Sequence, residues 1–102
     1  MHIINLNASN WKTVMDFYDA VLAAVGAPKW HGVSPDALID SMVFGGINSV
    51  TPPYTIRISG TANLPTNVRE ELQVAKEALE EGRKDFRSLK GRDVQVGIEI
   101  DP

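Results

Sequence analysis

The chain has 102 residues, of which 43% are hydrophobic and 23% are charged, and its formal net charge is −3. This length fits one domain over residues 1–102, and the hydrophobic content argues against a disordered chain. Because phosphate groups are bound by basic surfaces, the acidic balance argues against direct nucleic-acid binding and is compatible with a basic protein partner.

The first predicted elements are a strand and a helix. Residues 2–6 are expected to form the strand, and Ser9 or Asn10 can cap the helix that follows. This helix is expected to end at Gly26, which can adopt the left-handed conformation of a helix terminus. Its apolar residues recur at intervals of three and four, which predicts one buried stripe. The stripe consists of Trp11, Val14, Tyr18, Val21 and Val25.

A loop and a second, shorter helix follow. Ser34 and Pro35 are typical of a helix start, with a capping side chain followed by proline at the first helical position. The helix is expected to run to about Val43. Leu38 and Met42 are four residues apart, so both should face the core.

The remaining elements are a strand, a long helix and a last strand. Residues 54–59 and 94–100 alternate apolar and polar side chains, which is typical of strands with one buried face. The helix between them is expected to begin near residues 65–67 and to end near Gly82 or Phe86. Strands separated by helices pair in parallel. We therefore predict an α/β fold in which helices cover one face of a parallel sheet, while the other face is open to solvent or to self-association as a homodimer.

The sequence also bears on compartment and cofactors. The absence of cysteine favours a reducing compartment such as the cytoplasm and excludes thiolate metal sites. Residues 1–10 have no basic region and only a short apolar run, so no signal peptide is expected. No segment approaches the roughly 20 apolar residues that span a bilayer, so no membrane association is expected. Gly45-Gly46 lacks the following Lys of a phosphate-binding loop, and no cofactor is predicted.

Two carboxylates stand out near the start of the second helix. Asp36 and Asp40 are four residues apart and would share one helix face, without a Lys or Arg on that turn to relieve their repulsion. Such a pair suits a cationic partner. A plainer interpretation also holds, because Asp in a first turn stabilises a helix and an exposed Asp is often only solvated. Likewise, Trp30 could fill the core, and Gly32 could simply supply a positive φ.

The segment Trp30-His31-Gly32 followed by Asp36-Ala37-Leu38-Ile39-Asp40 resembles the signature of the barstar family. The resemblance implies a three-stranded parallel sheet packed with helices. It also implies a loop and helix that block the active site of a secreted basic bacterial ribonuclease or a related protein toxin. By this resemblance Asp40 mimics the RNA phosphate, Asp36 is a second charged contact, and Trp30 and His31 are aromatic contacts.

Other positions of the same segment are expected to face the partner. They are Gly32, Ser34 and Ile39. Val33, Ser34 and Pro35 are less polar or less bulky than is usual in the family, and the chain is longer than the best-known member at residues 44–53 and 82–92.

Two other functional classes have less support from the sequence. His31, Ser34 and Asp36 are the residue types of a nucleophilic enzyme, but working triads are defined by geometry and their closeness in sequence gives no support. A metal site from His31, Asp36 and Asp40 would have too few ligands. The sequence therefore predicts a binding protein and not an enzyme. The alternative is a barstar-fold interaction or oligomeric protein with a different protein partner.

Overall fold

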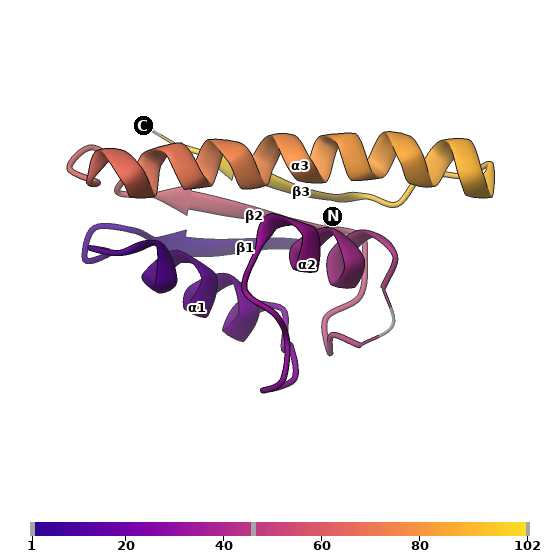
Figure 1. The fold of residues 1–102 in the computed structure, drawn as a ribbon, viewed down its shortest axis with the longest axis horizontal. Helices are drawn as coiled ribbons and strands as arrows, with labels where there is room; N and C mark the ends of the chain where they lie inside the picture. The colour runs from indigo at the N-terminus through magenta and orange to yellow at the C-terminus, as the bar shows by residue number, and fades with distance from the viewer. Residues whose placement is uncertain (1, 46, 102) are drawn as a thin grey trace.

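The computed structural model describes residues 2–45 and 47–101 and shows the expected α/β order of elements (Figure 1). The short second helix α2 runs directly into a π-helical turn, η1. The elements are β1 (His2–Asn7), α1 (Val14–Ala24), α2 (Pro35–Leu38), η1 (Ile39–Val43), β2 (Tyr54–Ser59), α3 (Thr66–Lys90) and β3 (Val96–Ile100).

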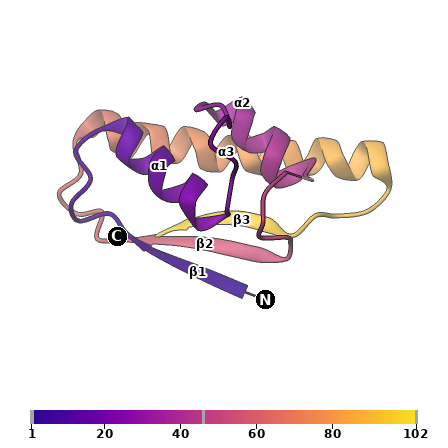
Figure 2. The ribbon, with the colours of Figure 1, turned by 90° about the horizontal axis from the view of Figure 1, so that it is seen from below.

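The three strands form one parallel sheet with β2 in the middle. Ile4, Ile56 and Ile98 lie side by side in its register. Because side chains along a strand alternate between faces, such rows make one face of the sheet apolar. Figure 2 shows α1, α2 and α3 all on the same side of the sheet. The core lies between this apolar face and the helices, and its largest fully buried side chains include Phe17, Tyr18, Leu38, Met42, Ile56, Ile58, Leu72 and Leu79.

No helix of the described residues lies on the opposite face of the sheet (Figure 2). One row of this face consists of Asn5, Arg57 and Glu99, and Arg57 Nε lies 3.2 Å from Glu99 Oε2. The neighbouring row contains Thr55 and Gly97 beside Ile3. The expected open face is therefore confirmed, and its side chains are mostly polar or small, which suits contact with water.

The first helix begins later than the sequence suggested. Its cap is Thr13, and neither Ser9 nor Asn10 caps it. Thr13 Oγ1 accepts a hydrogen bond from Asp16 N (3.2 Å), and Asp16 Oδ2 accepts one from Thr13 N (3.1 Å). This capping box satisfies two backbone N–H groups at once, whereas a lone capping side chain satisfies one. Trp11 consequently lies before the helix, where its ring packs against Phe17 with a centroid distance of 5.9 Å.

The long helix ends later than the sequence suggested. It continues through Gly82 and Phe86 to Lys90, and Gly91 closes it with a left-handed φ of 71°. The last strand then begins at Val96 and not at Val94. Although α3 has 25 residues, no helix within the described ranges is apolar enough over its length to cross a bilayer.

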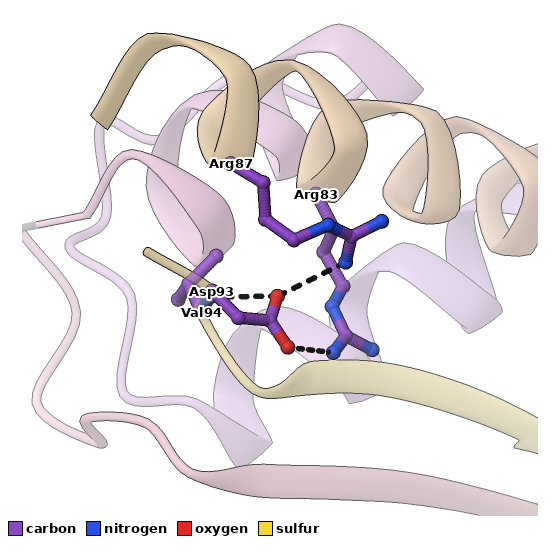
Figure 3. Close-up of polar contacts among 4 residues, drawn as sticks. All are labelled: Arg83, Arg87, Asp93 and Val94. Atoms are coloured by element: carbon purple, nitrogen blue, oxygen red, sulfur yellow. Dashed lines mark hydrogen bonds and ion pairs between the residues drawn. The ribbon is translucent and has the colours of Figure 1, made fainter. Parts of the chain in front are cut away.

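A carboxylate joins the end of α3 to the segment that leads into β3 (Figure 3). Asp93 accepts hydrogen bonds from Arg83 Nη2 at 2.7 Å and from Arg87 Nη1 at 3.2 Å. The amide of Val94 also donates to Asp93 Oδ1 at 2.9 Å. The Arg83 guanidinium, supported by Arg87 and by the Val94 amide, holds the pKa of Asp93 below its ordinary value of 3.8.

Asp93→Asn is expected to lower stability at neutral pH and to flatten the acid side of the stability profile. A carboxyl whose pKa is depressed by folding stabilises the protein above its unfolded-state pKa, and this contribution is lost as pH falls through the folded-state pKa. The difference from wild type should thus be largest above about pH 4 and shrink below it. Urea unfolding at a series of pH values measures this. Asp85→Asn, which removes a carboxylate of α3, is the control, and an equal effect of the two changes would contradict the assignment.

Candidate functional site

The loop between α1 and α2 projects from the body of the molecule (Figure 1). It leaves α1 at Gly26, whose φ of 67° turns the chain away from the helix axis. The base of the loop is held by the segment before β2. Ser49 N donates to Gly26 O at 3.1 Å, and Val50 N donates to Val25 O at 3.0 Å. The loop is therefore anchored at its base, and its tip faces outward.

The two aromatic residues of the loop lie in opposite environments. Trp30 is 73% exposed, whereas His31 is only 8% exposed. His31 Nδ1 lies 2.6 Å from Gly32 O, and since a carbonyl only accepts, Nδ1 carries the proton. Its Nε2 is buried without a hydrogen-bond partner in the described part of the chain. Trp30 is thus available to a partner, and His31 supports the loop from inside.

Gly32 lies close to α2 and does not have a positive φ. It is not among the glycines with positive φ, so that interpretation of the sequence was wrong. A Cβ at this position would lie 3.3 Å from the Cβ of Ala37 in α2. The missing side chain therefore lets the loop pack against the first turn of the helix that carries Asp36.

Ser34 begins α2 as the sequence suggested. Its φ and ψ are extended, its Oγ accepts a hydrogen bond from Ala37 N at 3.1 Å, and Pro35 takes the first helical position. The cap satisfies one of the free N–H groups of the helix start. It also fixes the direction in which the chain leaves the loop.

Ser34→Ala is expected to lower the free energy of unfolding by about 1 kcal/mol, because the Ala37 N–H loses its side-chain acceptor. Chemical denaturation measures the loss. Ser34→Asn keeps an oxygen that can cap the helix and should cost clearly less than the alanine change. If both substitutions were equally destabilising, the cap would not be the source of the effect.

After α2 the chain continues as the π-helical turn η1, which contains Asp40. Phe44 N donates to Ile39 O at 3.2 Å, and Gly45 N donates to Asp40 O at 2.9 Å, which are the five-residue spacings of a π-helix. Such turns are rare and are frequently found at functional sites. Ile39 is half-buried against α3, where a Cβ at Gly82 would come within 2.8 Å of Ile39 Cγ2.

Asp36 and Asp40 are both exposed. Neither side chain forms a hydrogen bond or an ion pair with another residue of the described ranges, in contrast to Asp93. All their acceptor positions therefore face solvent, and an Arg or Lys of a partner could bind them through charge-assisted hydrogen bonds.

The geometry gives no support to the catalytic or metal alternatives. Ser34 Oγ is used as a helix cap, and the only His31 nitrogen with a partner bonds to Gly32, so His31 and Ser34 are not hydrogen-bonded to each other. Among residues 2–45 and 47–101, no three His, Cys, Asp or Glu side chains are grouped so that they could hold a metal ion. The arrangement offers carboxylates and an aromatic side chain for binding.

A sequence model of the family described as Barstar (barnase inhibitor) matches residues 1–99. The chain belongs to the barstar family. No curated protein matches the sequence. The match spans β1 through most of β3, and it therefore includes the loop, α2 and η1. The three-stranded parallel sheet expected from the resemblance to barstar is confirmed.

Sequence reasoning missed two features of this barstar-family site. Gly82 was taken as an end of α3, whereas it is the point at which η1 packs closely on that helix. An isolated glycine inside a helical pattern costs about 1 kcal/mol relative to alanine, so its presence can draw attention to the position but does not identify the packing partner. The contact between the Phe44 ring and Phe86 of α3, at a centroid distance of 5.5 Å, was not predicted either. No periodicity in the sequence links these two rings.

Proposed function

We propose that this barstar-family protein is a cytoplasmic, non-catalytic inhibitor that binds a basic ribonuclease, or a related protein toxin, and blocks its active site. The observation that carries the proposal is the pair of exposed carboxylates of Asp36 in α2 and Asp40 in η1, which have no partner among the described residues. A ribonuclease must bind RNA phosphates, so its active site holds cationic side chains. The two carboxylates are negatively charged, as RNA phosphates are, and they lie on a protrusion that is anchored at its base.

The site residues have distinct roles in this proposal. Asp40, an exposed residue of the π-helical turn, takes the position of the RNA phosphate, and Asp36 binds a second cation. Trp30 packs on the rim of the active site, since large aromatic side chains are frequent energetic anchors of interfaces. His31, Gly32, Ser34 and Ile39 act mainly by holding the loop and helix in place, although the loop backbone also faces the partner.

Charge complementarity raises the rate of association as well as the affinity. The chain has a net charge of −3, and a secreted basic ribonuclease would be attracted to it before contact. The alternative function through the open sheet face has less support, because that face is mostly polar and pairs Arg57 with Glu99 internally.

The test is a titration of the purified protein into basic secreted bacterial ribonucleases while RNA cleavage is followed. With the ribonuclease held well above the dissociation constant, cleavage should fall linearly and reach zero at one inhibitor per enzyme. A folded protein that leaves cleavage unchanged across such a panel would refute the proposal and would leave the binding site with another partner. Binding without loss of cleavage would refute the active-site part.

A further inference from the structure

Buried polar atoms without a hydrogen-bond partner gather at the base of the binding loop. Among the described residues these side-chain atoms are His31 Nε2, both amide atoms of Asn48 and Arg83 Nε. Arg83 is already paired through another nitrogen, because its Nη2 donates to Asp93 Oδ2 at 2.7 Å. His31 belongs to the loop, and Asn48 belongs to the segment that holds the loop in place. A buried polar group without a partner lowers the stability of a protein, so these two side chains are candidates for a function.

The backbone brings Asn48 to the base of the loop. Ser49 N donates to Gly26 O at 3.1 Å, and Val50 N donates to Val25 O at 3.0 Å. These two bonds join the segments in antiparallel order, so the residue before Ser49 lies beside the residue after Gly26. The Ser49 hydroxyl also donates to Gly26 O, at 3.1 Å. Asn48 is therefore held beside the start of the loop.

His31 is tied to the same part of the loop and has the complementary hydrogen-bonding chemistry. Its backbone N–H donates to Pro28 O at 3.0 Å, which closes a turn that begins two residues after Gly26. Nδ1 of its ring carries the proton that is donated to Gly32 O, so Nε2 can only accept a hydrogen bond. Asn48 Nδ2 can only donate one. A hydrogen bond between these two nitrogen atoms would satisfy both of them.

We propose that Asn48 Nδ2 donates a hydrogen bond to His31 Nε2 when the ribonuclease is bound, which makes Asn48 a positioning residue of the loop. In the free protein, transient opening of the exposed loop lets water reach both groups. A bound partner covers the loop and prevents this opening, so each group then needs a partner within the protein. The change requires side-chain rotation, which is common when interfaces form. The inference rests on the proposed function and adds to it a residue that acts through His31.

The first test measures both the affinity and the stability of Asn48→Ala. Its dissociation constant for a ribonuclease that the wild-type protein inhibits should rise about ten-fold, because the covered His31 Nε2 is left without a donor. The urea midpoint of the free variant should stay the same or rise, because the change removes a buried polar group that has no partner there. Asn63→Ala, at an exposed asparagine before α3, is the control, and its affinity should stay within about two-fold of wild type. A lower midpoint together with weaker binding would indicate an ordinary structural contact and overturn the inference.

The second test identifies the donor by nuclear magnetic resonance of protein labelled with ¹⁵N in its two histidines. The Nε2 resonance of His31, identified by its absence in His31→Phe, should shift when the ribonuclease binds the wild type and shift much less in Asn48→Ala. Equal shifts would mean that the ribonuclease supplies the donor and would overturn the role of Asn48, as would unchanged affinity of Asn48→Ala. Both of these outcomes leave the inhibitor proposal standing. If the wild-type protein binds no ribonuclease of the panel, both proposals fail together.

Discussion

Asp40→Ala is expected to weaken binding of a basic ribonuclease by at least about 30-fold, because removing one partner of a buried charge pair costs roughly 2–5 kcal/mol. The free energy of unfolding should hardly change, since the Asp40 side chain is exposed and has no partner among the described residues. Inhibition constants and urea unfolding of the same preparation measure the two effects. The expected result is a loss of binding without a loss of stability.

Two further variants test whether the loss of binding is due to the charge of Asp40 and not to the loss of any surface carboxylate. Asp40→Asn keeps the shape of the side chain and removes its charge, so it should lose most of the same affinity. Asp19→Ala removes an exposed carboxylate of α1 and should have little effect, because surface charges away from an interface act mainly on the rate of encounter. If Asp19→Ala and Asp40→Ala weakened binding equally, general charge attraction and not a specific anchor would explain the inhibition.

Gly82→Ala is expected to damage both the fold and the binding site. A new methyl would lie 2.8 Å from Ile39 Cγ2 and 3.6 Å from Val43 Cγ2. Ile is branched at Cβ and has little rotamer freedom in a helix, so η1 must move away from α3. Overpacking lowers the free energy of unfolding by about 1–3 kcal/mol, whereas replacing glycine by alanine inside a helix raises it by about 1 kcal/mol. We therefore expect the free energy of unfolding to fall by about 1 kcal/mol. Binding should fall by about ten-fold or more, because the displaced turn carries Asp40.

A double-mutant cycle tests this explanation. Ile39→Ala removes the methyl that Gly82→Ala would meet, so the double variant should be more stable than the sum of the single effects predicts. Gly97→Ala is the control, because a Cβ at Gly97 meets nothing within 4 Å, and its change should be near neutral. Additive effects of Gly82→Ala and Ile39→Ala would show that close packing at this point does not position η1.

The strands and the acidic helix could be predicted because their patterns are local. Ile56 and Ile98 alternate with polar residues, and one buried face is the simplest structure that fits such a pattern. Ser34 followed by Pro35 likewise fixed a helix start that the structure confirms. The exposure of Asp40 follows from the same helix, since Leu38 and Met42 take its buried side.

The predictions that were wrong or missing concern residues whose environment depends on distant parts of the chain, or positions at which two residues could cap the same helix. Ser9 has the right chemistry for a helix cap, but the reciprocal bonds of Thr13 and Asp16 satisfy more backbone groups. Trp30 and His31 are neighbours of similar type, and only the packing of the loop decides that one is exposed and the other buried. The contact of η1 with Gly82 depends on the distance between two helices, which no local pattern contains.

In the proposed complex, the loop, α2 and η1 form the surface that enters the ribonuclease active site. The most direct measurement is a map of backbone amide chemical shifts of the isotope-labelled protein with and without an inhibited ribonuclease. We expect the largest changes on residues 30–40, with Asn5, Arg57 and Glu99 on the open sheet face unchanged. Changes concentrated on those three residues, with residues 30–40 unaffected, would contradict the proposed complex.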